Sequence, residues 1–122
     1  NQLNMNVPVV MGEWGGLFPK KTDWFSHIDF VYSLIEQNQW SSLYWNYYFE
    51  NDEFVRLMNR PYPIAVCGDI ISYRTDSNER KFFMEYNVSD DYVLAETQIY
   101  VPNKGVQKFK SNYGINKIEI SY

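Results

Sequence analysis

Glu13 is the residue of this sequence whose surroundings most suggest chemistry, because glycines stand on both sides of it. Gly12 precedes the carboxylate and a glycine pair at 15–16 follows it, so the backbone is free to adopt a positive φ or to pass close to a ligand. Trp14 adds a flat apolar wall. The apolar run at 9–11 has no period-two alternation, which predicts a parallel strand, buried on both faces, that delivers Glu13 at its end.

These residues allow two interpretations. A carboxylate beside an aromatic wall at a strand end is an arrangement that a sugar site can use. Alternatively, Glu13 is a solvated residue of a glycine-rich turn and Trp14 is a core residue.

The composition is that of a folded, acidic chain. Of its 122 residues, 45% are hydrophobic and 19% are aromatic, which excludes disorder and supplies a packed core. The net charge is −4 and no run of Lys or Arg occurs, so nucleic acid is excluded as a partner. No apolar stretch approaches the roughly 20 residues that span a bilayer. Cys67 is the only cysteine, so an internal disulfide cannot form, and we expect it to be a small buried residue.

The first half of the chain predicts a strand, a helix and a second strand. Apolar residues recur at helical spacing over about 23–37, with Thr22 and Asp23 as possible caps. Residues 40–48 are rich in aromatics and free of Gly and Pro, as expected for a strand. Together these elements predict a βαβ unit with a parallel crossover. Because only two such strands are present and the chain opens on Asn1, we expect part of a larger domain.

The sequence pattern changes after the two prolines of residues 60–63, which end any helix and mark a domain boundary. Short strand-like runs with turns between them then indicate an antiparallel sandwich. These runs are 70–74, 81–86, 97–101 and 117–121. Residues 75–79 predict the turn of a hairpin between the first two runs, and 102–105 end the third. The predicted fold class is thus α/β plus all-β.

Several of these segments resemble the retaining (β/α)8 glycosidases of glycoside hydrolase family 5. Residues 8–15 resemble the seventh barrel strand, where a Gly-Glu pair followed by an aromatic residue and Gly carries the nucleophile. Trp45 resembles the eighth-strand tryptophan at the sugar-binding floor. Within the family, residues 60–68 resemble the junction of endoglycoceramidases and related glucosylceramide or steryl-glucoside hydrolases, and 96–102 are similar to a strand of their C-terminal β-sandwich.

The resemblance implies that residues 1–59 are strand 7, helix 7 and strand 8 of a (β/α)8 TIM barrel, and that 60–122 are a C-terminal β-sandwich, incomplete at its end. It further implies that Glu13 is the nucleophile that attacks the anomeric carbon. The partner carboxyl group, acid and then base, would lie on the fourth strand, upstream of Asn1. We therefore expect the chain to be inactive by itself. The implied reaction cleaves the β-glycosidic bond between the glycan and the ceramide of a glycosphingolipid.

The resemblance also implies sugar contacts from Trp45. Trp14 is a second candidate for substrate binding, although its role is expected to be mostly structural. Phe18 and Tyr47 follow the two strand ends, where they would line a slot for the lipid or pack two domains together. The expected partner is a glycolipid or oligosaccharide, with membrane contact only through that substrate. No partner protein is predicted. The substrate class favours secretion or a lysosomal or vacuolar location.

The other acidic residues of the first half are poor candidates for the second catalytic carboxyl group. Glu50, Asp52 and Glu53 follow the second predicted strand and could approach the rim, although charge clusters in loops are usually solvated. Asp23, Asp29 and Glu36 fall on the predicted helix and are expected on its solvated face. His27 is the only histidine and has no Cys or His partner in the pattern, so neither a metal nor another cofactor is predicted. Asn87 opens an Asn-Val-Ser tripeptide that fits an N-glycosylation acceptor in a secreted protein.

Two other interpretations stay open. The sandwich could be a non-catalytic carbohydrate- or lipid-binding module, or it could brace a barrel and touch no ligand. Glu13 distinguishes these from the enzyme, since neither role needs a carboxylate between glycines at a strand end.

Overall fold

The computed structural model describes residues 7–15, 21–45, 52–89 and 95–122, apart from the side chains of 21 and 22. The chain forms two compact units, Asn1–Met58 and Asn59–Tyr122, which are described separately below. Neither described helix is long and apolar enough to cross a membrane.

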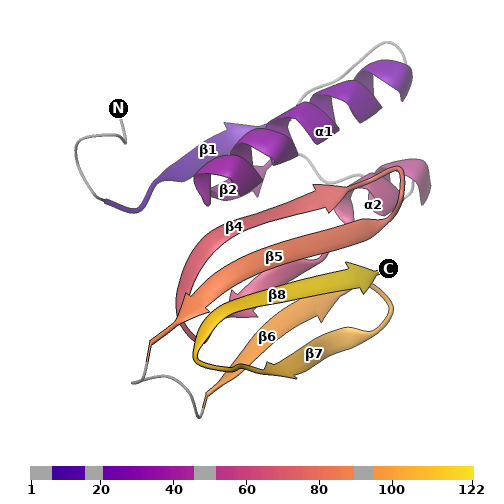
Figure 1. Cartoon of the computed structure of the whole chain (residues 1–122). Helices are drawn as coiled ribbons and strands as arrows, with labels where there is room; N and C mark the ends of the chain where they lie inside the picture. The colour runs from indigo at the N-terminus through magenta and orange to yellow at the C-terminus, as the bar shows by residue number, and fades with distance from the viewer. Residues whose placement is uncertain (1–6, 16–20, 46–51, 90–94) are drawn as a thin grey trace. The chain divides into compact units, whose positions relative to one another are not determined.

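The first unit contains a parallel strand pair joined by a helix (Figure 1). Its elements are β1 (Val10–Trp14), α1 (Lys21–Asn38), β2 (Ser41–Tyr44) and α2 (Asp52–Met58). Because β1 and β2 pair in parallel with α1 between them in the chain, the predicted βαβ unit is confirmed. The helix is slightly longer than its apolar pattern predicted. The second strand is shorter, although 46–48 of its predicted range lie outside the described residues.

One face of this strand pair packs against the helices. Ile28 of α1 and Phe54 and Leu57 of α2 are buried together, with Trp14 and Tyr44 of the strands against them. The other face is open in this chain. Val10 and Leu43 are 60% and 61% exposed, so the prediction that β1 is buried on both faces is wrong here, because the described helices cover one face only.

The helix also corrects one expectation about charge. Glu36 is 7% exposed and does not lie on a solvated face. It follows Ile35, which is also buried, and thus lies at the edge of the apolar stripe. Asp23, at the start of α1, is exposed as predicted, and Asp29 is half-buried.

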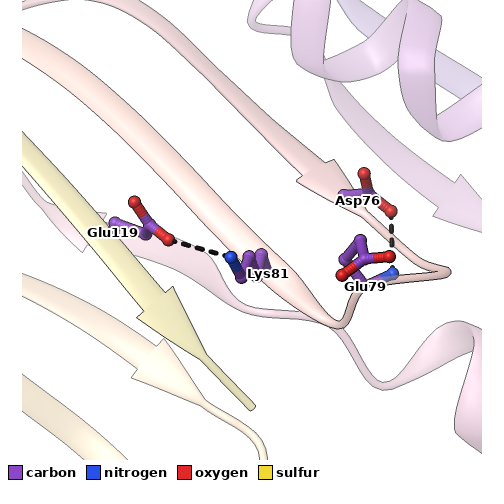
Figure 2. Close-up of polar contacts among 4 residues, drawn as sticks. All are labelled: Asp76, Glu79, Lys81 and Glu119. Carbon is purple, nitrogen blue, oxygen red and sulfur yellow. Dashed lines mark hydrogen bonds and ion pairs between the residues drawn. The ribbon is translucent and has the colours of Figure 1, made fainter.

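The second unit is an antiparallel β-sandwich, as predicted (Figure 1). One sheet has the order β3-β6-β7 and the other β4-β5-β8. The strands are β3 (Tyr62–Ala65), β4 (Asp69–Asp76), β5 (Lys81–Val88), β6 (Glu96–Val101), β7 (Gly105–Lys110) and β8 (Gly114–Ser121). The predicted hairpin of β4 and β5 is confirmed. In its turn the Asp76 carboxylate accepts hydrogen bonds from the backbone N–H groups of Asn78 and Glu79, of which Figure 2 shows the second.

The core of the sandwich comes from strict alternation along the two central strands. Every second residue of β5, from Phe82 to Val88, is buried, as are Ile99 and Val101 of β6. Cys67 is 3% exposed in this core, as expected, and its backbone N–H donates to Thr97 Oγ1 at 3.1 Å. Each fully buried large apolar side chain contributes about 1.5–3 kcal/mol, so these residues are the main stabilising contribution.

Two strands had no counterpart in the sequence analysis. β3 begins within the predicted boundary segment, because it is an edge strand and an edge tolerates Pro63. β7 pairs with β6 through the turn predicted at 102–105. Half of its residues are polar and its burial is weak, since it is also an edge strand.

Candidate active site

A β-bulge determines where Glu13 points. Opposed residues of β1 and β2 have matching exposure. The opposed pairs are Val10 with Ser41, Met11 with Ser42, Glu13 with Leu43, and Trp14 with Tyr44. Gly12 has no partner in this register. Two residues therefore lie between Met11 and Trp14 on β1, whereas only Leu43 lies between their partners on β2. Because side chains alternate along a strand, the extra residue turns Glu13 to the face opposite Met11.

Glu13 therefore lies on the open face of the strand pair. Met11 and Trp14 are half-buried on the face toward α1, whereas Glu13 is exposed together with Val10 and Leu43. Without the bulge, period-two alternation would put Met11 and Glu13 on one face, beneath the helix. The other described side chains of this face, Val10, Ser41 and Leu43, are uncharged, so Glu13 is its charged group among the described residues of β1 and β2.

Gly15 is the glycine that this geometry requires. Its φ of +134° is a conformation that L side chains rarely adopt. A Cβ built there would overlap the carbonyl oxygen of Trp45 and lie 3.1 Å from the Tyr44 ring. Gly12 has neither restriction, because nothing lies within 4 Å of its Cβ position and its φ is not positive. The second residue of the predicted glycine pair, at 16, lies outside the described residues.

Trp45 continues the ladder directly past β2. Its backbone N–H donates to the carbonyl of Trp14 at 2.8 Å, which holds it at the carboxyl end of the strand pair. Its side chain is 65% exposed. Since Trp45 is two residues beyond Leu43, alternation places it on the same face as Glu13. The fold thus brings Glu13 and Trp45 to one edge and one face.

Trp14 lies on the opposite face from Glu13. Its ring meets Tyr44 at 4.7 Å and Tyr32 of α1 at 5.4 Å between centroids, both edge-on. Such pairs stabilise packing by about 0.5–1.5 kcal/mol beyond area burial. This packing accounts for Trp14 as part of the helix–sheet core, and we assign it no substrate contact.

Phe18 and Tyr47 lie outside the described residues, so their placement stays a prediction. Within the described part of the chain, no three His, Cys, Asp or Glu residues gather as metal ligands would. The bulge at Gly12 was not predicted, although a glycine inside a strand is the pattern that indicates one.

The second unit gives the family of the chain. Residues 60–120 match the model of the glycoside hydrolase family 5 C-terminal domain, and they cover half of the 122 residues. The chain therefore belongs to this family, and membership implies a glycosidase. The predicted relation to glycoside hydrolase family 5 is confirmed at that level. No curated protein matches the chain.

Proposed function

We propose that this chain is the C-terminal part of a retaining glycosidase that releases the glycan of a glycosphingolipid, with Glu13 as its nucleophile. The observation that carries the proposal is the orientation of Glu13, on the face of β1 and β2 that the helix does not cover. In a (β/α)8 barrel the helices cover the outside, and the other face of the strands lines the interior. The exposed Val10 and Leu43 are apolar, as residues inside such a barrel are.

The position of Glu13 along the strand also supports the proposal. Active sites of (β/α)8 barrels are built at the carboxyl ends of the strands. Glu13 is the penultimate residue of β1, and Trp45 directly follows the end of the parallel strand β2. Both residues would therefore be at the catalytic end of a barrel.

In the proposed reaction, a Glu13 oxygen attacks the anomeric carbon and the bond from that carbon to the ceramide oxygen breaks. The ceramide oxygen takes a proton from the acid carboxyl group, on a strand outside this chain. Water then attacks the anomeric carbon of the glycosyl–Glu13 ester. The partner carboxyl group, now ionised, accepts the proton from water, and the Glu13 carboxylate is released. The two carboxyl groups of such a site lie about 5–5.5 Å apart.

Trp45 would provide the apolar surface on which a sugar ring stacks, since its side chain is largely exposed. Phe18 and Tyr47 would line the slot for the lipid, and the enzyme would contact a membrane through this substrate. The chain by itself, Asn1 to Tyr122, would have no activity, because the acid carboxyl group is on another part of the enzyme.

The test uses the full-length parent enzyme and its Glu13→Gly variant, assayed for glycan release from glucosylceramide and from a ganglioside. We expect the variant to lose on the order of 10⁴-fold or more in kcat, as enzymes without their nucleophile do. Azide should then restore turnover and give a glycosyl azide of inverted anomeric configuration, because azide fills the space of the carboxylate.

Asp23→Asn is the matched control, since it removes an exposed carboxylate from α1 of the same unit. It should leave kcat unchanged. Full activity of Glu13→Gly, or loss of activity with no glycosyl azide formed, would exclude Glu13 as the nucleophile. Activity on oligosaccharides but on neither glycolipid would retain the nucleophile and reject the lipid substrate.

A further inference from the structure

The outer face of the β4-β5-β8 sheet carries a shallow hollow of about 350 Å³. Outward side chains from three neighbouring strands line it in two rows across the sheet. The rows are Ser72, Glu85 and Lys117, and Arg74, Phe83 and Glu119. These residues face outward because the residues between them on β5 fill the core. The volume of the hollow is within the range of small-ligand sites.

The charged side chains of the hollow are held in place by one another. The Arg74 guanidinium carbon lies 4.1 Å from the centroid of the Phe83 ring. Lys117 Nζ is 3.3 Å from Glu85 Oε2, and Lys81 Nζ is 3.3 Å from Glu119 Oε1 across β5 and β8 (Figure 2). Figure 2 shows this second pair bridging the two strands. A ligand would thus meet hydrogen-bond donors and acceptors from three neighbouring strands.

These ion pairs remain open to solvent. The Lys117 side chain is 75% exposed and that of Glu119 is 57% exposed. Exposed ion pairs contribute only about 0–1 kcal/mol each, so a ligand can take over their hydrogen bonds at little cost to stability.

The balance of charge selects the ligand class. Arg74 and Lys117 are offset by Glu85 and Glu119, so the lining has no net charge. A phosphate or an anionic lipid headgroup would meet as many carboxylates as cations. An extended peptide adds to the edge of a sheet through its backbone and does not need a central face. Neutral sugar hydroxyls both donate and accept hydrogen bonds, and the apolar face of a sugar ring suits the surface formed by Phe83 and Arg74.

We infer that this hollow on the β4-β5-β8 sheet binds a neutral oligosaccharide. The glycan would lie across the two rows, with carboxylates accepting from its hydroxyls and Arg74 and Lys117 donating to them. The inference does not rest on the proposed role of Glu13, which belongs to the other unit of the chain.

The test is a titration of the ¹⁵N-labelled 122-residue chain with neutral tetrasaccharides of different linkage, namely cellotetraose, maltotetraose and lacto-N-neotetraose. At least one should shift the amide signals of β4, β5 and β8 around Phe83 with a Kd near or below about 1 mM. Inorganic phosphate should not. The inference fails if none of the three sugars binds below about 10 mM, if the shifts fall on the β3-β6-β7 sheet, or if phosphate shifts the same signals equally.

A matched pair of variants tests the residues. Lys117→Ala removes an ion pair from the hollow, and Lys108→Ala removes the comparable pair with Glu96 from the other sheet, where the atoms are 3.7 Å apart. Binding should weaken about fivefold or more in Lys117→Ala and stay unchanged in Lys108→Ala, with dispersed spectra showing that both fold. Equal binding by Lys117→Ala and the unchanged chain would overturn the assignment.

Discussion

Replacement of Gly15 by alanine is predicted to destabilise the first unit, whereas the same replacement at Gly12 should have little effect. The two glycines flank Glu13 and look equivalent in the sequence. In the fold, however, Gly15 has a φ of +134° and no space for a Cβ, while Gly12 has open space around its Cβ position.

The size of the effect follows from two costs at Gly15. Holding a residue other than glycine in such a region of φ costs about 1–3 kcal/mol. The added Cβ must also push back the Trp45 carbonyl, which strains the 2.8 Å hydrogen bond from Trp45 to Trp14 and removes part of its roughly 0.5–1.5 kcal/mol. We expect a loss of about 2–4 kcal/mol. Gly12→Ala should change the free energy of unfolding by less than about 1 kcal/mol.

Urea unfolding followed by tryptophan fluorescence measures this loss in one unit alone, because all 4 tryptophans lie in Asn1–Met58. The chain, Gly15→Ala and Gly12→Ala are compared under the same conditions. If Gly15→Ala is unfolded without urea, a native spectrum of Gly12→Ala still separates the two positions.

Equal unfolding midpoints for Gly15→Ala and Gly12→Ala would show that neither the φ of Gly15 nor the Trp45 carbonyl restricts this position. So would a destabilised Gly12→Ala beside an unaffected Gly15→Ala, because the bulge at Gly12 would then be the position that cannot accept a side chain.

The remaining predictions concern the sandwich and are measured by urea unfolding with far-ultraviolet circular dichroism. Phe82→Ala, at a side chain with 0% exposure, should lower the free energy of unfolding by about 3–5 kcal/mol, whereas Tyr113→Ala, at 67% exposure, should change it by less than about 0.5 kcal/mol. Similar losses in the two variants would contradict the assignment of Phe82 to the core. Tyr86→Phe removes the 2.8 Å buried hydrogen bond with Ser111 and should cost about 1–3 kcal/mol, and an unchanged midpoint would mean that Ser111 finds another partner. Asp76→Ala removes the acceptor of two hydrogen bonds in the turn between β4 and β5 and should lower the free energy of unfolding by about 0.5–1.5 kcal/mol. Asp76→Asn keeps an acceptor oxygen and should lower it less. The reverse order would show that these hydrogen bonds do not stabilise the turn.

The sequence predicted those elements in which the spacing of apolar residues matches the face that is buried in the fold. The helix and the β4–β5 hairpin were recognisable because their apolar residues repeat with the period of the structure. The edge strands β3 and β7 were not, because only pairing with β6 makes them strands. Glu36 was misjudged for a similar reason, since burial of a charged residue depends on the neighbours that the fold supplies.

The candidate site also combines features that were visible in the sequence with features that depend on the fold. The sequence pattern alone showed a carboxylate between glycines at the end of an apolar strand and an aromatic residue in the next strand. The folded chain was needed to show that Glu13 and Trp45 share a face and that Trp14 lies on the other one. The cause is the register of β1 against β2, because one unpaired residue at Gly12 reverses the side-chain alternation beyond it.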